Sequence, residues 1–164
     1  MRVFAISGFS MSGKTTLVER IVRELVKRGY TVSTIKSSKE DILAPSGTDT
    51  RKHLDAGASF TVLLGPQSTA IRSRRRLPIR KIVNSIDADF LIIEGMKNLD
   101  IPRFWCLGKE MQMPERSDFV KAYVAWPGSD ISIADSRTIL TSDEIEDLTS
   151  IVEREAVDFL TLKV

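Results

Sequence analysis

Residues 8–15 read Gly8-Phe9-Ser10-Met11-Ser12-Gly13-Lys14-Thr15, which matches the phosphate-loop pattern G-x-x-x-x-G-K-[ST]. The apolar run RVFAIS at residues 2–7 precedes this loop and predicts a buried strand. After Lys14, apolar residues recur at helical spacing and Gly29 follows as a helix-ending glycine. The sequence therefore predicts strand, glycine loop and helix in the order that a phosphate loop requires. The periodic residues are Leu17, Val18, Ile21, Val22, Leu25 and Val26.

Each residue type in this loop has a chemical reason to be there. Glycines let the backbone curl so that successive N–H groups point at phosphate oxygens, and the start of the helix adds a positive dipole end. We expect Lys14 to reach the β and γ phosphates and the Thr15 hydroxyl to bind Mg²⁺, with Thr16 supporting the same loop. The predicted nucleotide-binding residues are Gly8, Ser10, Met11, Ser12, Gly13, Lys14, Thr15 and Thr16.

A phosphate loop also needs an acid near the magnesium ion, at the end of a neighbouring strand. Glu94 ends the buried run at residues 90–93, whereas Asp89 precedes that strand and is expected at its far end. Glu94 is therefore the predicted magnesium-side acid. Asp49 is a second metal candidate, although an aspartate there is equally an ordinary helix-start residue. Lys97 would add positive charge or simply face solvent.

The rest of the chain alternates strands with helices. Strands are predicted at residues 30–36, 59–64, 69–72, 103–107 and 119–126, and helices at residues 48–56 and 78–86. Thr141 and Glu144 predict a capping box that opens a closing helix reaching Phe159. The expected fold is α/β, a P-loop NTPase-like and mostly parallel sheet with helices on both faces. At 164 residues we expect a single domain, 1–164.

Composition narrows the functional classes. The formal charge of +2 is too balanced for a protein that coats nucleic acid by electrostatics alone. Cys106 is the only cysteine and the first residues do not resemble a secretory signal, so we expect a cytoplasmic protein. The apolar runs fall short of the roughly 20 residues that span a bilayer, so no membrane association is expected.

The densest basic cluster begins at the end of the strand predicted at residues 69–72. Its arginines suit a phosphate or carboxylate partner, but a solvated loop explains them equally well. RNA binding is less favoured because no aromatic residues interleave with them. His53 is expected on a helix surface, and Trp105 and Trp126 in a core or interface without a ligand. The candidate anion or partner site consists of Arg72, Arg74, Arg75, Arg76 and Lys97.

Three blocks together resemble the molybdopterin-guanine dinucleotide biosynthesis adaptor protein B (MobB) family. They are SGFSMSGKTTLVERIVRELVKRGYTVSTIK, SGTDTRKHLDAGA and ADFLIIEGMK. The resemblance implies a homodimer that binds GTP with Mg²⁺, hydrolyses it weakly at most, and assists the guanylyltransferase that attaches GMP to molybdopterin. It also implies contact with molybdopterin or its molybdenum form. By position, Asp49 matches the family's loop aspartate, and Glu94, Gly95 and Lys97 match its EGxK-like block.

The chain departs from the family pattern after Lys36, where Ser37, Ser38, Lys39 and Glu40 stand in place of histidines. The N-K-x-D motif that reads guanine in GTPases is absent, so the GTP preference comes from the resemblance. No catalytic residue is assigned. Two alternatives stay open: a small P-loop kinase, which the same loop would serve, and a nucleic-acid-binding module using the arginines.

Overall fold

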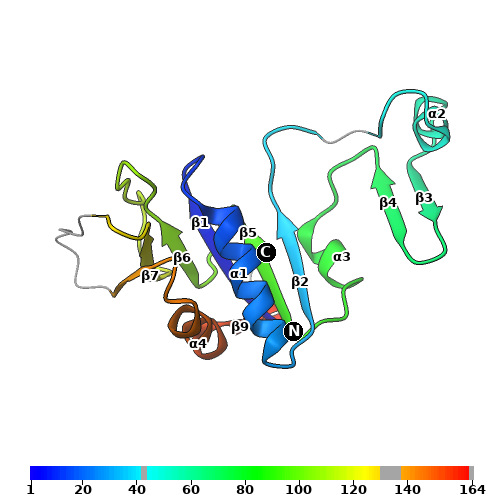
Figure 1. Ribbon diagram of the computed structural model, residues 1–164. Helices are drawn as coiled ribbons and strands as arrows, with labels where there is room; N and C mark the ends of the chain where they lie inside the picture. The colour runs from blue at the N-terminus through cyan, green and yellow to red at the C-terminus, as the bar shows by residue number, and fades with distance from the viewer. Residues whose placement is uncertain (42–43, 130–137, 163–164) are drawn as a thin grey trace. The chain divides into compact units, whose positions relative to one another are not determined.

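The computed structural model describes residues 1–41, 44–129 and 138–162. The chain forms two compact units, one comprising Met1–Ser37 and Ile86–Val164 and the other Ser38–Ser85 (Figure 1). We call them unit 1 and unit 2. Whether they act as one domain over residues 1–164 stays a prediction.

Unit 1 is built on a seven-stranded sheet in which the order β2-β5-β1-β6-β7-β8 is parallel throughout. β9 adds an antiparallel partner to the first residues of β1. The predicted α/β class and mostly parallel sheet are confirmed. The strands are β1 (Arg2–Gly8), β2 (Val32–Lys36), β5 (Phe90–Glu94), β6 (Arg103–Cys106), β7 (Val120–Ala125), β8 (Ile139–Thr141) and β9 (Val157–Asp158).

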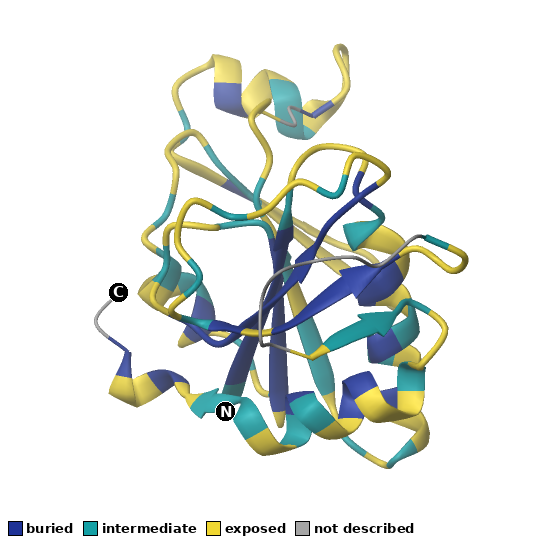
Figure 2. Cartoon of the chain, turned by 90° about the vertical axis from the view of Figure 1, so that its left-hand side faces the viewer, coloured by how far each residue is buried: buried dark blue, intermediate teal, exposed yellow. Residues whose placement is uncertain are grey.

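The core of unit 1 lies between this sheet and two helices, α1 (Lys14–Lys27) and α4 (Ile145–Glu155), which contact each other. β1 and β5 are buried along their length because each is paired on both sides, and they form the dark core in Figure 2. α1 buries Leu17, Ile21 and Leu25, the periodic stripe that the sequence predicts. Because this stripe is buried against the sheet, the start of α1 is held next to the end of β1.

β5 and β6 are parallel strands on either side of β1, and the connection between them is unusual because it contains no helix. The chain passes from one side of β1 to the other through residues 95–102. A segment without regular structure leaves backbone carbonyls that need other donors. Arg103, the first residue of β6, supplies several of them, as described below.

Unit 2 contains the predicted hairpin, β3 (Phe60–Leu64) and β4 (Thr69–Ser73), flanked by α2 (Asp49–Asp55) and α3 (Ile79–Val83). The Gly65 N–H donates to the Ser68 carbonyl across the turn, at 2.8 Å. The helix predicted at residues 78–86 is too long, since α3 ends at Val83 and buries Val83 alone.

The predicted capping box is wrong as a helix start. α4 begins at Ile145 and Thr141 belongs to β8, although the Glu144 carboxylate accepts from Thr141 N at 2.6 Å and Oγ1 at 2.9 Å. Phe159 lies beyond α4, in the 3₁₀ helix η1 (Phe159–Thr161). In the described part of the chain, no helix is long and apolar enough to cross a membrane.

Candidate functional site

The glycine loop lies between β1 and α1, as predicted, and two of its glycines are required by geometry. Gly8 has φ +146°, and a Cβ there would lie 2.6 Å from both the Cys106 carbonyl oxygen and Ser12 Oγ. Gly13 has φ +87°, and a Cβ there would lie 3.2 Å from Trp126 Nε1. The loop backbone thus passes too close to β6 for a side chain at Gly8. At Gly13 the positive φ disfavours a side chain, and Trp126 would have to shift by a few tenths of an ångström to admit one.

The side chains of the loop divide into an outward and an inward set. Ser10 and Met11 are exposed at its apex, and Met11 adopts φ 60°. Ser12 is buried, and its carbonyl accepts from Trp126 Nε1 at 3.3 Å. Lys14 Nζ donates to the Phe9 carbonyl and, at 3.3 Å, to Ser12 Oγ. The Lys14 ammonium therefore lies against the loop's own backbone.

Partial burial lowers the pKa of Lys14 from its usual value, while the neighbouring Cys106 and Glu94 raise it and Lys36 lowers it. An ammonium that has lost part of its hydration gains more from an anionic ligand than an exposed one does. Burial raises the pKa of the Cys106 thiol to about 12, so this side chain beside the loop stays neutral at physiological pH.

Thr15 and Glu94 come together at the ends of α1 and β5, as the sequence predicts. The Thr15 hydroxyl donates to Glu94 Oε1 at 2.8 Å, and Glu94 is buried. A hydroxyl and a carboxylate oxygen are the hard donors that Mg²⁺ prefers, and phosphates and waters usually complete its shell. These residues therefore fit a magnesium ion. Within the described residues, no group of three or more His, Cys, Asp or Glu side chains is arranged to hold a metal alone.

Lys36, which sequence reasoning did not single out, contacts both of these oxygens. It lies opposite Glu94 in the pairing of β2 with β5. Its Nζ is 3.1 Å from Glu94 Oε1 and 3.2 Å from Thr15 Oγ1. The ammonium thus neutralises the buried carboxylate at the two atoms that would ligate magnesium.

The turn after β5 is also tightly held. Ser7 Oγ donates to the Gly95 carbonyl at 3.0 Å, and Gly95 N–H donates to the Ile6 carbonyl at 2.9 Å. Gly95 has φ +93°, as a turn so close to the sheet requires. Lys97 follows this turn, with its Nζ 5.2 Å from the centre of the Phe9 ring. Lys97 is therefore beside the phosphate loop.

The remaining predicted residues belong to unit 2. Asp49 lies in the first turn of α2, is exposed, and pairs with Lys52 at 3.3 Å. Arg72 lies opposite Thr61 in the hairpin, and its buried Nη1 has no hydrogen-bond partner. Arg74, Arg75 and Arg76 are exposed beyond β4. The metal role of Asp49 and the anion role of these arginines stay predictions.

Beside the loop lies a cavity of about 230 Å³ that sequence reasoning missed. It is bounded by the loop and the first turns of α1, and by the ends of β7 and β8. Trp126, expected in a core or interface without a ligand, lies just after β7, lines this cavity and donates to the phosphate loop. Arg20 crosses the cavity wall to Asp143 at 2.6 Å. Only the three-dimensional arrangement joins these residues.

A parallel sheet, a glycine loop that starts a helix, and an acid on the adjacent strand that contacts the loop's threonine define a protein of the P-loop NTPase class. The profile of the family described as "Molybdopterin guanine dinucleotide synthesis protein B" (MobB) matches residues 3–126, more than half of the chain. The chain belongs to this family, which confirms the resemblance noted from the sequence.

Curated relatives carry names of the same kind. A molybdopterin-guanine dinucleotide biosynthesis adapter protein of Haemophilus influenzae is 28% identical over 157 residues, covering 92% of this chain and 87% of that protein. A protein of Methanocaldococcus jannaschii named for the same adapter role is 37% identical over 110 residues, covering 63% of this chain. The match spans 46% of the length of the M. jannaschii protein.

Solved structures agree with the fold. The crystal structure of Bacillus subtilis MobB superposes with a TM-score of 0.76 at 19% identity, covering 96% of this chain and 99% of that one. A MobB homologue from Bacillus stearothermophilus gives a TM-score of 0.69 at 20% identity, covering 94% of this chain and 97% of that one.

The close approach at Gly8 makes a first prediction. Gly8→Ala should lower the free energy of unfolding by about 2 to 4 kcal/mol, because the new methyl group meets the Cys106 carbonyl and the residue keeps a strained φ. Urea unfolding measures this change. Gly29→Ala is the control, since Gly29 has φ +90° with nothing near its Cβ and should cost only about 1 to 2 kcal/mol. Equal losses in the two variants would contradict the clash.

Lys36 makes a second prediction. Lys36→Met should let Mg²⁺ alone stabilise the protein against heat more than it stabilises the wild type. The variant leaves Glu94 without the ammonium that neutralises it, so a magnesium ion has no competitor there. Melting curves with and without MgCl₂ test this. Lys27→Met, which breaks an ion pair with Glu24 away from the loop, is the control. An identical Mg²⁺ response in all three proteins would show that Lys36 does not compete.

Proposed function

We propose that this protein binds GTP with Mg²⁺ at the glycine loop and acts as an adapter in the assembly of molybdopterin guanine dinucleotide. The observation that carries this proposal is the cluster of Lys14, Thr15 and Glu94 at the ends of two adjacent parallel strands. Proteins bind a magnesium-bound triphosphate with such a set of groups: a glycine loop at a helix start, a lysine, and a threonine beside a carboxylate. Membership of the MobB family supports the adapter role.

When bound, the magnesium ion would neutralise the triphosphate. Thr15 and Glu94 would hold it, and Lys14 would leave the Phe9 carbonyl for the phosphate oxygens. Lys36 would give up its contact with the metal-side oxygens and would add a second positive charge to that of Lys14. These exchanges replace contacts within the protein by contacts with the ligand.

We place the nucleoside in the cavity beside Trp126. It opens directly from Ser12, Gly13 and Thr16, so a nucleotide anchored by its phosphates enters it without leaving the loop. The indole supplies an aromatic wall for a base, and the Asp143 carboxylate is an acceptor for N–H donors such as those on guanine. The guanine preference is supported by the names of the relatives, which refer to a guanine dinucleotide.

We expect GTP hydrolysis to be slow at most. The carboxylate beside Thr15 accepts from that hydroxyl and pairs with Lys36, so these contacts and the proposed metal ion occupy it rather than an attacking water. An adapter does not need turnover. The catalytic step would belong to the partner guanylyltransferase, which is the expected partner together with molybdopterin or its molybdenum form.

Titration calorimetry with GTP and ATP, each with Mg²⁺, tests the nucleotide site. We expect wild-type protein to prefer GTP. Lys14→Ala should weaken GTP binding by roughly 10- to 100-fold, because a charge-assisted contact to phosphate is lost. Lys27→Ala, on the exposed side of α1, should bind as the wild type does. Unchanged GTP affinity in Lys14→Ala would show that GTP does not bind at this loop. Nucleotide turnover that depends on an added acceptor metabolite would favour a kinase.

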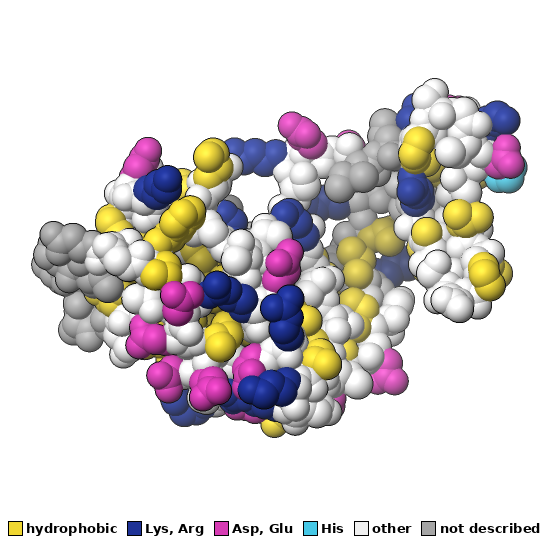
Figure 3. Space-filling model, viewed as in Figure 1, with side chains coloured by type: hydrophobic (Ala, Val, Ile, Leu, Met, Phe, Trp, Pro, Cys, Tyr) yellow, Lys and Arg dark blue, Asp and Glu magenta, His cyan; other side chains and the backbone are white. Residues whose placement is uncertain are grey.

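We further propose that the protein is a homodimer that pairs through its β3–β4 hairpin. Phe60, Val62 and Leu64 alternate along β3, and Val62 lies opposite Ile71 of β4, so all four share one face. They are exposed, up to 76% for Leu64, and hydrophobic side chains gather over this hairpin in Figure 3. A two-stranded sheet alone is marginally stable and leaves both edges unpaired. A second copy, which brings the same face and the same edges, completes it symmetrically.

Sedimentation equilibrium tests this interface. Val62→Thr with Ile71→Thr keeps β-branched residues in both strands but removes apolar surface. The double variant should weaken dimerisation by at least about tenfold. Leu160→Ser, which removes an exposed apolar residue of unit 1, is the control and should leave the dimer intact. A monomeric wild type, or equal weakening by both changes, would contradict the hairpin interface.

A further inference from the structure

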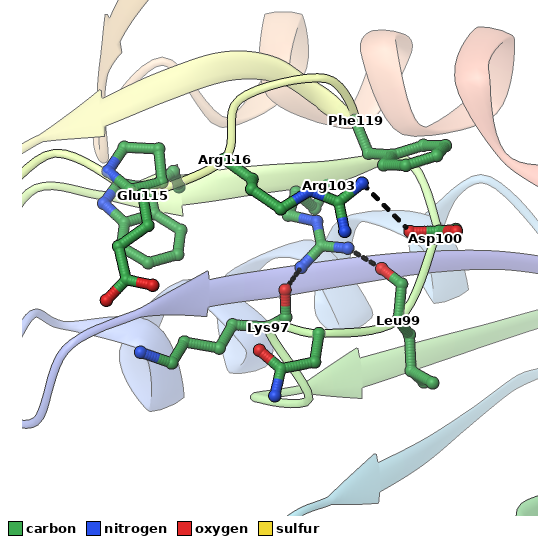
Figure 4. A pocket seen from close by; sticks show the side chains of 10 residues that line it. Lys97, Leu99, Asp100, Arg103, Glu115, Arg116 and Phe119 are labelled. Carbon is green, nitrogen blue, oxygen red and sulfur yellow. Dashed lines mark hydrogen bonds and ion pairs between the residues drawn. The ribbon is translucent and has the colours of Figure 1, made fainter.

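A second polar pocket lies beside the phosphate loop, on residues that the nucleotide site does not use. It is lined by the segment after β5, the first residues of β6 and the segment that precedes β7 (Figure 4). Its wall includes Trp105, whose ring meets the ring of Phe9 in the phosphate loop edge to face, 5.5 Å between centres. Its polar donors come from Lys97, Asn98, Arg103 and Arg116.

Arg103 is the centre of this pocket and is only 4% exposed. Its guanidinium donates to the carbonyls of Lys97, at 2.5 Å, and of Leu99 (Figure 4). It also donates to the Ile101 carbonyl at 3.2 Å. These bonds hold the helix-free connection between β5 and β6. They account for three of the five N–H groups of an arginine, so two remain for another acceptor.

These three bonds satisfy donors but do not neutralise the charge. Arg103 makes no ion pair with a carboxylate in the described part of the chain, and Asp100, which also lines the pocket, pairs instead with Arg116. Burial lowers the pKa of Arg103 from its usual value, while Asp100 raises it and Arg116 lowers it. A cation buried without an anion is costly, and proteins normally pair it.

Two further cations lie at the rim with their charges weakly engaged. Arg116 is 3.7 Å from Asp100 and 3.5 Å from Asp118, which is longer than a charge-assisted hydrogen bond, and 68% of its side chain is exposed. Lys97 is exposed, and its ammonium lies over the face of the Phe9 ring. Both side chains can turn toward an anion next to Arg103 at little cost.

We propose that this pocket binds the phosphate group of a phosphomonoester, held by Arg103 from below and by Arg116 and Lys97 from the rim. Planar guanidinium groups match phosphate oxygens, and the anion supplies the charge that Arg103 lacks. Trp105 and Phe119 offer apolar walls for the rest of the molecule. A phosphorylated pterin, the class to which the names of the relatives refer, is one source of such a group; this source rests on the proposed function, whereas the site does not.

The test uses the Lys14→Ala protein, in which the phosphate loop is weakened, and glycerol 3-phosphate as the probe. Binding is followed by the NMR signals of the Arg103 Nε–H and the Trp105 indole N–H, which donates to the Gln112 carbonyl. We expect both signals to shift saturably, while the Trp126 indole, which contacts the phosphate loop, does not shift. No saturable shift of the Arg103 signal would overturn the proposal.

Charge variants separate a built site from general attraction. Arg116→Gln and Lys97→Gln, in the same background, should each weaken glycerol 3-phosphate binding by about tenfold. Arg154→Gln is the matched control because Arg154 is an exposed arginine of α4 outside the pocket. Equal weakening by Arg154→Gln would overturn the proposal, as would unchanged binding in both pocket variants. Folding of each variant is checked by its amide spectrum.

Two additional probes identify the source of the phosphate. A pterin that carries a phosphomonoester and the same pterin without phosphate are compared with glycerol 3-phosphate. Tighter binding of the phosphorylated pterin supports a pterin ligand, and equal binding of the two phosphates supports a general phosphomonoester site. Equal binding of the pterin with and without phosphate would overturn the proposal. If the wild-type protein does not bind GTP, that result would count against the proposed nucleotide site but not against this phosphate pocket.

Discussion

The hydrogen bond from Thr15 to Glu94, 2.8 Å long, joins the first turn of α1 to the end of β5. It can form only because β5 pairs directly with β1, which brings the acid to the strand end from which the glycine loop starts. The burial of β1 and β5 and the stripe of α1 that packs on the sheet hold both ends of this bond. The contact between Thr15 and Glu94 therefore depends on strand order more than on any single side chain.

Much of this arrangement is readable from the sequence. The run before Gly8, the periodic residues after Lys14 and the buried run that ends in Glu94 are local patterns, and the structure places all three as expected. Lys36 and Trp126 are different, because nothing in their local sequence shows that parallel pairing sets Lys36 opposite Glu94 or that β7 ends beside Ser12. The Thr141 and Glu144 contact exists, but β8 uses Thr141, and tertiary pairing overrides the local capping signal.

Contacts within the protein engage the charged groups at the loop. Three groups at the end of the sheet, Lys14, Lys36 and Glu94, carry a net positive charge in a partly buried place. Lys14 lies on a backbone carbonyl and Lys36 on the carboxylate, so neither charge is left bare. Each contact is weaker than one to a triphosphate with Mg²⁺ would be, which favours exchange when that ligand arrives.

The route from β5 to β6 explains why a second cation is buried so close by. A helix in that connection would satisfy its own carbonyls, but residues 95–102 lack one, and Arg103 satisfies three of them from the start of β6. A neutral donor such as asparagine has two N–H groups and does not reach three separated carbonyls. The arginine that donates to these carbonyls brings a full charge. It lines the same pocket as Trp105, whose ring packs edge to face against Phe9 of the phosphate loop. The pocket that contains Arg103 and the phosphate loop therefore share one aromatic contact, that of Trp105 with Phe9.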